Sequence, residues 1–554
     1  MLERFLPRTE FSSYEDFKLH YKVNIPEDFN YGFDVVDAWA EQDDDKPALL
    51  WCDDHGGERS FTFGEIKRLS NKAVHFFKAQ GIVKGDPVML VLRQRWEYWI
   101  CAVALHKLGA VLIPASDQLT AKDIRYRCEA ASIRMIVCVA DDYVLKQTEE
   151  ALPGCPSLIS KAIVAGTRPG WLDFVSAVDK YPDSFDRPQD DTRTHNSDLM
   201  LMYFTSGTTG MPKMAMHDFT HPLGHIVTAK YWQCVQEGKL HMTTADSAWA
   251  KFGWGKIYGQ WICGAIVFAY DWDRFVPSKL LEKVSRYKVT TFCATPSHYR
   301  FMLQEDLSKY DLSSVKRAGI AGEPLNPEVM RKWHDLTGIR LHEGYGQSES
   351  SVLVANFPWF EPRPGSMGMP SPLYEIDLAG EDGESVDEGE EGEIVVRGMN
   401  EYLPTGLFLG YYNDPEITSD AMRGGSYHTG DVAWRDSDGY YWFVGRNDDV
   451  IKCSGYRIGP FEVESALLEH PAVLECAITA VPDPVRGQVV KATVVLTQAY
   501  SKKGDDALKK ELQDHVKHVT APYKYPRIVV FTDELPKNIA GKIKRAEIRE
   551  SDKK

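Results

Sequence analysis

Residues 205–213 read Thr205-Ser206-Gly207-Thr208-Thr209-Gly210-Met211-Pro212-Lys213, and they follow an apolar run, Leu199 to Phe204, that predicts a buried strand. Gly207 and Gly210 allow backbone conformations that other residues avoid, and they leave backbone N–H groups uncovered. Four hydroxyl groups and the Lys213 ammonium add further hydrogen-bond donors. A strand that opens into such a loop suits an anion with several oxygens, above all a phosphate.

This loop differs from the phosphate loop of GTPases and motor proteins. That loop needs glycine, lysine and a hydroxyl residue in direct succession, whereas Met211 and Pro212 separate the last glycine from the lysine here. The alternative is a surface turn rich in serine, threonine and glycine, which is common in loops. Nine ordered positions favour a binding loop for a different kind of ATP chemistry.

The stretch resembles the signature of the adenylate-forming superfamily, which includes acyl-CoA synthetases, aryl-CoA ligases, luciferases and the adenylation domains of peptide synthetases. The resemblance implies that Lys213 is catalytic and that the loop binds the phosphates of ATP. The loop residues assigned to ATP are Thr205, Ser206, Gly207, Thr208, Thr209 and Gly210.

Length and net charge restrict the possible classes of protein. At 554 residues the chain is too long for one core, so we expect at least two domains. The net charge of −16 argues against general binding to nucleic acid or to an anionic membrane. Residues 501–554 nevertheless hold 14 Lys and Arg against 9 Asp and Glu, a local charge of +5 that leaves −21 for the remainder. This basic tail is either a solvated helix face or a receiver of a polyphosphate ligand.

The ten cysteines are scattered and form no Cys-x-x-Cys pair, which predicts neither a metal cluster nor a disulfide framework. Residues 1–14 have no continuous apolar centre, so we expect no signal peptide. No apolar run approaches the ~20 residues that span a bilayer. We therefore expect a cytoplasmic protein. The mitochondrial matrix is the alternative for a eukaryotic source, although no clear transit peptide is present.

Strand and helix patterns alternate from residue 87 onward. Apolar runs predict strands over 87–92, 110–114, 135–140 and 290–294, and amphipathic runs predict helices over 96–108, 121–131 and 277–288. Such alternation implies parallel sheet with right-handed crossovers. Short strands and tight turns follow from about residue 367, and the acidic stretch 380–392 reads as a solvated hairpin loop. Residues 182–196 read as a polar connector.

We therefore predict an α/β fold, α+β overall. A large N-terminal domain, residues 1–446, would hold two parallel-sheet α/β subdomains and a small β-barrel. A hinge at 447–449 would lead to a small, mobile α+β C-terminal domain, residues 450–554, with strands near 474–481 and 489–496 and a helix near 506–519.

A second signature lies at residues 343–349, which read Glu-Gly-Tyr-Gly-Gln-Ser-Glu, after a strand predicted over 340–342. Ligands bind at this end of open parallel sheets. The superfamily carries Tyr-Gly-x-Thr-Glu here, and Ser348 keeps the hydroxyl. The resemblance implies that Tyr345 lines adenine, Ser348 meets phosphate and Glu349 holds Mg2+. The nucleotide residues assigned from this segment and from the matching Gly-Glu-Pro segment are Glu343, Gly344, Tyr345, Gly346, Gln347, Ser348, Gly322, Glu323 and Pro324.

Two further signatures complete the nucleotide site. Residues 427–431 read Tyr-His-Thr-Gly-Asp, and by resemblance Asp431 accepts the ribose hydroxyl protons while Arg446 meets phosphate or ribose oxygens. Residues 536–542 resemble the family's Pro-Lys-Thr-x-Ser-Gly-Lys, with Asn538 and Ala540 in place of hydroxyl residues. Lys542 is then the catalytic lysine that stabilises charge on the attacking carboxylate and the α-phosphate.

The segment after the third signature resembles the hinge and CoA loop of acyl-CoA synthetases. Asp448 would be the pivot between two catalytic arrangements of the domains. Arg457 would face the nucleotide phosphate, and Gly455 would line a narrow pantetheine tunnel. The residues assigned to CoA by this resemblance are Ser454, Gly455, Tyr456, Arg486, Lys517, Tyr525 and Arg527.

The segment 249–261 resembles that of medium-chain acyl-CoA synthetases. Acetate-specific relatives close the acyl pocket with a tryptophan at the position of Gly346, so we expect a larger acid here, of short-branched to medium length. The predicted pocket residues are Trp249, Phe252, Gly253, Trp254 and Gly346. Core packing is the alternative role for this aromatic stripe.

The sequence thus predicts an AMP-forming acyl-CoA synthetase that uses ATP, Mg2+ and coenzyme A. The alternatives are an aryl-CoA ligase for benzoate-like acids, a module that loads a carrier protein, and a non-catalytic nucleotide-binding relative. We expect a carboxylic acid and CoA as partners, no nucleic acid and no membrane span, and we leave a homodimer open.

Overall fold

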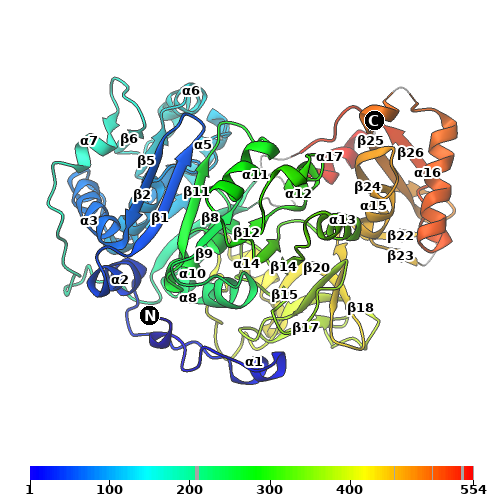
Figure 1. Ribbon diagram of the computed structural model, residues 1–554, viewed down its shortest axis with the longest axis horizontal. Helices are drawn as coiled ribbons and strands as arrows, with labels where there is room; N and C mark the ends of the chain where they lie inside the picture. The colour runs from blue at the N-terminus through cyan, green and yellow to red at the C-terminus, as the bar shows by residue number, and fades with distance from the viewer. Residues whose placement is uncertain (206–210, 454–455, 502, 538–541, 553–554) are drawn as a thin grey trace.

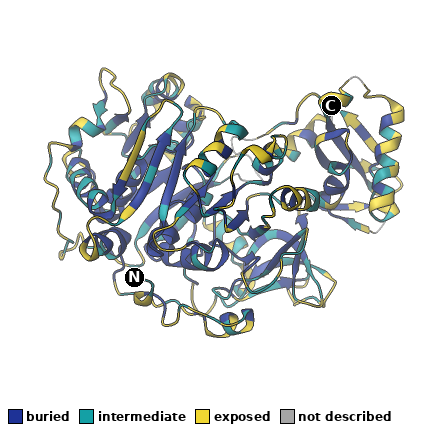
Figure 2. Ribbon diagram, in the orientation of Figure 1, coloured by how far each residue is buried: buried dark blue, intermediate teal, exposed yellow. Residues whose placement is uncertain are grey.

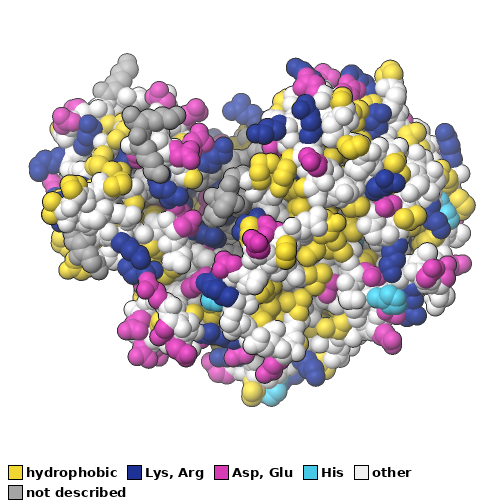
Figure 3. Space-filling view, turned by 180° about the vertical axis from the view of Figure 1, so that it is seen from behind, with side chains coloured by type: hydrophobic (Ala, Val, Ile, Leu, Met, Phe, Trp, Pro, Cys, Tyr) yellow, Lys and Arg dark blue, Asp and Glu magenta, His cyan; other side chains and the backbone are white. Residues whose placement is uncertain are grey.

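The computed structural model of the chain describes residues 1–205, 211–453, 456–501, 503–537 and 542–552. A large body is followed by a small C-terminal unit, which lies to one side of it (Figure 1). Seen from behind, a notch separates this unit from the body (Figure 3). The strands of the sheets are largely buried, whereas helices such as α16 (Asp506–Val519) turn an exposed face outward (Figure 2). The predicted α/β class is confirmed.

The first sheet is built from apolar runs that are buried on both faces. β3 and β5 are flanked by parallel neighbours, and β8 joins the same sheet next to β4. Continuous apolar strands of this kind are typical of a parallel sheet covered by helices. In the described part of the chain its order is β19 (Gly410–Tyr411), β9 (Lys213–Asp218), β8 (Leu199–Thr205), β4 (Val111–Pro114), β3 (Pro87–Val91), β5 (Met135–Val139), β6 (Ser160–Val164), β7 (Leu172–Asp173).

The second sheet begins as a parallel sheet and continues as an antiparallel one. Its parallel part, with the edge hairpin strand β2, is β14 (Leu341–Tyr345), β13 (Arg317–Ile320), β12 (Thr291–Ala294), β10 (Leu240–Thr243), β11 (Ile266–Asp271), β1 (Pro47–Asp53) and β2 (Glu58–Thr62). The strand predicted to end at residue 342 extends to Tyr345, because Gly344 and Tyr345 pair with the antiparallel strand β15.

The predicted small barrel takes the form of an antiparallel extension of this second sheet, joined to it through β14 and β15. Its strands, in order, are β15 (Val354–Ala355), β16 (Ser366–Pro370), β21 (Tyr441–Arg446), β20 (Tyr427–Arg435), β18 (Glu391–Val396) and β17 (Ile376–Ala379). The acidic stretch 380–392 connects β17 to β18 as the predicted hairpin.

The C-terminal unit has its own sheet and its own hydrophobic core. Its described strands are β22 (Ile451–Cys453), β23 (Tyr456–Ile458), β24 (Val473–Asp483), β25 (Gly487–Leu496) and β26 (Ile528–Phe531). Helices α15 (Pro460–Leu468), α16 (Asp506–Val519) and α17 (Arg545–Ser551) accompany it. The strands and the helix predicted after residue 470 are confirmed within a few residues.

Local signals account for the helix boundaries in the body. The longest, α3 (Phe63–Ala79), starts at a capping box in which Thr62 and Glu65 exchange hydrogen bonds. α4 (Glu97–Leu108) ends at Gly109, whose φ of 79° suits a residue without a side chain. The other body helices are α1 (Tyr14–His20), α2 (Ala38–Gln42), α5 (Ala121–Ala130), α6 (Asp142–Ala151), α7 (Phe174–Val178), α8 (His221–Ile226), α9 (Ala250–Gly255), α10 (Tyr258–Ile262), α11 (Pro277–Arg286), α12 (Pro296–Met302), α13 (Pro327–Thr337) and α14 (Pro415–Ala421).

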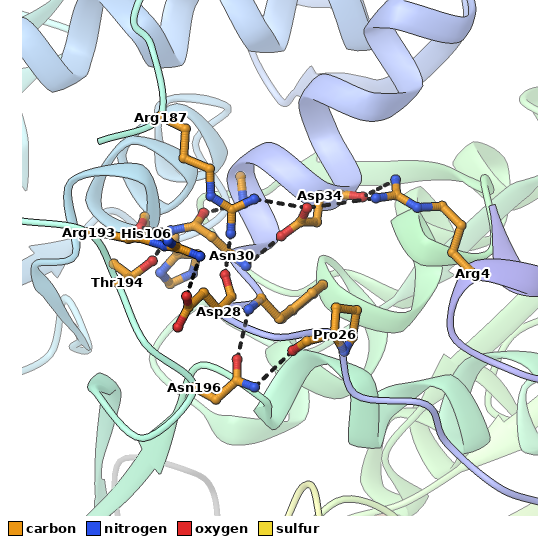
Figure 4. A network of polar contacts seen from close by, with 12 residues as sticks. Arg4, Pro26, Asp28, Asn30, Asp34, His106, Arg187, Arg193, Thr194 and Asn196 are labelled. Carbon is orange, nitrogen blue, oxygen red and sulfur yellow. Dashed lines mark hydrogen bonds and ion pairs between the residues drawn. The ribbon is translucent and has the colours of Figure 1, made fainter. Parts of the chain in front are cut away.

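Polar contacts fix the N-terminal segment to the connector 182–196 (Figure 4). Arg187 donates to Asp34, Asn30 donates to Thr194, and Asn196 donates to the backbone oxygen of Pro26. The predicted polar connector is therefore an anchoring segment. Among the described residues, no helix is both long enough and apolar enough to cross a membrane.

Candidate active site

The end of β14 and the strand β20 bring the second and third signatures together around one carboxylate. Asp431 is buried, and its Oδ2 accepts hydrogen bonds from the Tyr345 hydroxyl at 2.6 Å and from Gln347 Nε2 at 2.7 Å. Arg446 lies opposite Asp431 in the β20–β21 pairing, with Nη1 3.4 Å from Oδ1. These contacts fix a charged carboxylate in one orientation, as recognition of a sugar diol requires.

A second carboxylate, Glu349, lies beside two cations. Its Oε1 accepts a hydrogen bond from the Tyr411 hydroxyl at 2.9 Å. Burial raises the pKa of Glu349, whereas the Tyr411 hydrogen bond and the charges of Arg446 and Lys213 lower it. Lys213 itself begins β9 and points its ammonium over the Tyr411 ring, 4.9 Å from the centroid.

The surroundings of Glu349 fit a magnesium ion that is bound together with a nucleotide. Mg2+ is held in such sites by one or two carboxylates plus phosphate oxygens and water. Among the described residues, no three His, Cys, Asp or Glu side chains gather in a way that would hold a metal ion. A magnesium ion at Glu349 would therefore depend on phosphate oxygens from the substrate.

Strand alternation gives β14 two different faces. Glu343 is buried, and burial raises its pKa to about 8 although the Leu325 backbone N–H opposes this. Gly344 and Gly346 lie on the opposite face from Glu343. The backbone oxygen of Ser348 accepts a hydrogen bond from His217 Nε2 at 2.8 Å, which holds the turn after the strand.

The Gly-Glu-Pro segment follows β13 and meets a lysine that the motif analysis did not assign. Gly322 has a φ of 102°, and a Cβ atom built on it would lie 2.5 Å from Lys251 Nζ. Lys251 donates to the Ala321 backbone oxygen at 3.1 Å. Glu323 accepts a hydrogen bond from Ser297 at 3.0 Å. No sequence signal distinguished Lys251, because the role of a lysine in α9 depends on its neighbours in the fold.

The charge of Lys542, on the C-terminal unit, acts on Lys251. Burial lowers the pKa of Lys251, and the nearby positive charge of Lys542 lowers it further. The two lysines belong to different units and lie almost three hundred residues apart in the sequence. A cation such as Lys251, placed against the Gly-Glu-Pro segment, can stabilise a carboxylate that approaches a phosphate.

The predicted acyl residues do not all face the same space. Trp254 lies against Gly346, where a built Cβ atom would be 2.4 Å from the indole, so the glycine leaves no open space in this structure. Gly253 lies against Tyr203. Phe252 packs in the core against Tyr98, with ring centroids 4.7 Å apart, and Trp249 is the partly exposed residue before α9. The structure thus brings Trp254, but not Phe252, to the second signature.

The predicted CoA residues that the structure describes lie on the C-terminal unit. Lys517 and Arg527 both lie over the Tyr525 ring, 4.3 and 4.9 Å from its centroid. Tyr456 stacks on Tyr523 at 4.2 Å. Arg486 is exposed in the turn between β24 and β25. Lys517, Tyr525 and Arg527 therefore form one cluster, and Tyr456 stacks on Tyr523, two residues before Tyr525.

Arg457 faces the body of the protein and contacts the acidic hairpin. Its Nε lies 3.2 Å from Glu391 Oε2, and its Nη1 lies 3.6 Å from Glu381 Oε1. The predicted contact of Arg457 with a nucleotide phosphate would therefore require the small domain to move.

The predicted hinge separates two anchored residues. Arg446 belongs to β21 of the body, whereas Asp449 pairs with Arg549 and, at 3.8 Å, with Arg545 of α17. Asp448 lies between them and is exposed.

Comparison with known proteins agrees with this geometry. The profile described as "AMP-binding enzyme" matches residues 36–412, and "AMP-binding enzyme C-terminal domain" matches residues 462–542. The chain belongs to the AMP-binding enzyme family. Acyl-coenzyme A synthetase ACSM3, mitochondrial, of Mus musculus is 42% identical over 552 residues, which cover 98% of this chain and 94% of that protein. Acyl-coenzyme A synthetase ACSM5, mitochondrial, of Homo sapiens is 41% identical over 95% of this chain and 91% of its own.

Solved structures place the fold in the same family. An anthranilate CoA ligase, AuaEII, in complex with anthranoyl-AMP superposes with a TM-score of 0.86 at 28% identity, over 96% of this chain and 98% of its own. The Brucella canis acyl-CoA synthetase gives a TM-score of 0.70 at 29% identity, over 95% and 94%. The predicted membership of the adenylate-forming superfamily is confirmed.

Some predicted site residues lie outside the described residues. They are Ser206, Gly207, Thr208, Thr209 and Gly210 of the first signature, and Ser454 and Gly455 of the CoA loop.

Proposed function

We propose that this member of the AMP-binding enzyme family is an AMP-forming acyl-CoA synthetase for a short-branched to medium-chain carboxylic acid. The observation that carries the proposal is the convergence of Tyr345, Gln347 and Arg446 on the buried carboxylate of Asp431. The named relatives, which are acyl-coenzyme A synthetases over almost their whole length, support the same chemistry.

The first half-reaction forms an acyl-adenylate. An oxygen of the carboxylate attacks the α-phosphorus of ATP, and pyrophosphate leaves. Asp431 and Tyr345 would hold the nucleotide, while Lys542 and Lys251 would stabilise the negative charge that collects between carboxylate and phosphate. A magnesium ion at Glu349 would neutralise charge on the phosphate oxygens.

The second half-reaction forms the thioester. The sulfur of CoA attacks the acyl carbon, AMP leaves with the electron pair of the broken C–O bond, and the thiol proton is released. We propose that the C-terminal unit turns about Asp448 for this step, since Asn447 and Asp448 are exposed between Arg446 of β21 and Asp449, which pairs with α17. Arg486, Tyr456 and the Lys517–Tyr525–Arg527 cluster would then receive CoA.

An aryl acid is the second candidate substrate. The anthranilate CoA ligase has the same fold over 96% of this chain, and its acid carries a flat ring. The indole of Trp254 beside Gly346 would stack on such a ring as readily as it would border an alkyl chain.

The named relatives are mitochondrial, which is the location we kept as the alternative to the cytoplasm. The cytoplasmic location and a homodimer stay predictions.

The test is release of AMP, pyrophosphate and acyl-CoA with ATP and Mg2+, with and without CoA. The acids are acetate, butyrate, 2-methylbutyrate, hexanoate, octanoate and benzoate. We expect AMP and thioester to rise together only with CoA, and kcat/KM to be higher for one of the four- to eight-carbon aliphatic acids than for acetate. Highest kcat/KM on acetate would refute the assignment of acid size, and highest kcat/KM on benzoate would select the aryl-CoA ligase. Pyrophosphate exchange without any acyl-CoA would refute the synthetase assignment.

A further inference from the structure

One strand connects the first signature with the turn that follows the second. Lys213 begins β9, and strand alternation places Lys213 and His217 on the same face of it. Lys213 lies over the ring of Tyr411, whose hydroxyl donates to Glu349. His217 Nε2 lies 2.8 Å from the backbone oxygen of Ser348. The same face of β9 therefore reaches two consecutive residues of the second signature.

The surroundings of His217 hold its ring and fix its proton. The residue is 0% exposed, and its ring packs against Tyr203 and His221, with ring centroids 5.7 and 3.9 Å away. A carbonyl oxygen only accepts hydrogen bonds, so Nε2 must carry the proton. Burial lowers the pKa of His217 to about 4, although the hydrogen bond to Ser348 opposes this. The neutral ring therefore presents a fixed donor at Nε2.

The accepting oxygen belongs to the peptide group that joins Ser348 to Glu349. Because a peptide group is planar, a hydrogen bond to its oxygen fixes the direction in which both side chains leave the backbone. Tyr411 holds the Glu349 carboxylate as well. Within the described part of the chain, the Ser348 hydroxyl has no hydrogen-bond partner. This hydroxyl is therefore available to a ligand, and its direction depends on the peptide that His217 holds.

We propose that His217 is a positioning residue for the nucleotide, which orients the peptide between Ser348 and Glu349 so that the Ser348 hydroxyl meets the phosphate. This inference rests on the proposed function, because it assigns a residue outside the signatures to the same nucleotide site. No signature includes His217, which follows Lys213 by four residues. Its effect should be confined to the phosphate, since Tyr345 and Asp431 contact each other separately from His217.

The test compares the dissociation constants of AMP and adenosine for the native enzyme and His217→Leu, measured by competition binding without a metal ion. A hydrogen bond to a charged group corresponds to about 10-fold or more in affinity. The ratio of Kd for adenosine to Kd for AMP should therefore fall about 10-fold in His217→Leu, with Kd for adenosine unchanged. An equal loss of both affinities would show general damage to the site and would overturn the inference.

The matched control removes a hydrogen bond of the same kind elsewhere. His75 Nε2, on α3, donates at 2.9 Å to the backbone oxygen of Ser184 in the connector 182–196. His75→Leu should therefore keep the native ratio of the two dissociation constants.

A second pair of variants covers the case in which His217→Leu does not fold. The amide nitrogen of glutamine takes the place of Nε2, whereas that of asparagine takes the place of Nδ1. His217→Gln should therefore keep the native ratio, and His217→Asn should lower it about 10-fold. A native ratio in folded His217→Leu, or equal ratios in the folded Gln and Asn variants, overturns the inference while the proposed function stands. A native enzyme that forms no acyl-CoA from any acid overturns the proposed function itself.

Discussion

The ion pairs between Arg457 and the acidic hairpin predict that replacing a single carboxylate shifts the equilibrium between the two domain arrangements. Arg457 belongs to the C-terminal unit, and Glu391 and Glu381 belong to the body. If the small domain turns between half-reactions, these pairs must break before CoA can react. We therefore expect Glu391→Gln to favour the thioester-forming arrangement over the one described here.

The size of the effect follows from the exposure of the partners. The side chains of Arg457 and Glu391 are 34% and 30% exposed, and that of Glu381 is 86% exposed. Partly exposed ion pairs of this kind are worth about 0.2–1 kcal/mol. Loss of the Glu391 pair should thus change the ratio of the two arrangements by about 2- to 5-fold. Asn326 still donates to the Ser465 backbone oxygen at 3.2 Å in the variant, so the present arrangement should weaken without being lost.

The assay separates the two half-reactions. In single-turnover mixing of CoA with enzyme-bound acyl-adenylate, Glu391→Gln should form thioester about 2- to 5-fold faster than the native enzyme. Pyrophosphate exchange should fall only slightly if the arrangement described here forms the adenylate and is the more populated one, because the ratio of the two arrangements changes by only about 2- to 5-fold in all. Added salt should narrow the difference, because it screens the pair in the native enzyme.

The control removes a charge from the same hairpin without removing the pair. Within the described residues the Glu384 carboxylate forms no ion pair, so Glu384→Gln should leave both rates at their native values. Equal rates for Glu391→Gln and Glu384→Gln in both half-reactions would refute the reasoning.

Three further substitutions test the site. Asp431→Asn removes the charge that Tyr345 and Gln347 orient, and it should raise the KM for ATP at least 10-fold in pyrophosphate exchange with little change in thermal stability. Lys251→Met should lower the adenylation rate more than the rate of thioester formation from supplied acyl-adenylate. Glu343 has a folded-state pKa of about 8 against an ordinary value of 4.5. The unfolded state therefore loses this proton first, and the free energy of unfolding falls as pH rises from 4.5 to 8. In urea unfolding, the difference in the free energy of unfolding between Glu343→Gln and the native enzyme should therefore grow by about 3–5 kcal/mol, in favour of the variant, from pH 5 to pH 8.

Much of the fold could be predicted because buried parallel strands are nearly uniform apolar runs. The runs at 87–92 and 135–140 became β3 and β5 with small changes at their ends. The nucleotide residues stay predictions from short local signatures, of which the structure brings Tyr345, Gln347 and Asp431 into contact. The extension of β14 to Tyr345 was not predictable, because it depends on pairing with β15, which follows in a segment without a strand pattern.

The interactions that were missed join distant segments of the chain. Lys251 and Lys542 have no local feature that joins them, and only the placement of the small domain brings their charges together. The partner of Arg457 could not be predicted for the same reason. Its position in a family pattern suggested a phosphate partner, whereas the structure pairs it with a hairpin that precedes it by more than sixty residues.

The second signature contains two sets of residues, and the nucleotide motif explains only one of them. Residues 343–346 alternate large and small, and strand geometry sends these two sets to opposite faces. The large residues give the Tyr345 contact with Asp431 and the buried Glu343, which suit a nucleotide. On the other face, Gly344 lies against Trp232 and Gly346 lies against Trp254. A side chain added at Gly344 should therefore displace Trp232, whose indole lies 2.4 Å from a Cβ atom built there, before it disturbs the Tyr345–Asp431 contact on the other face.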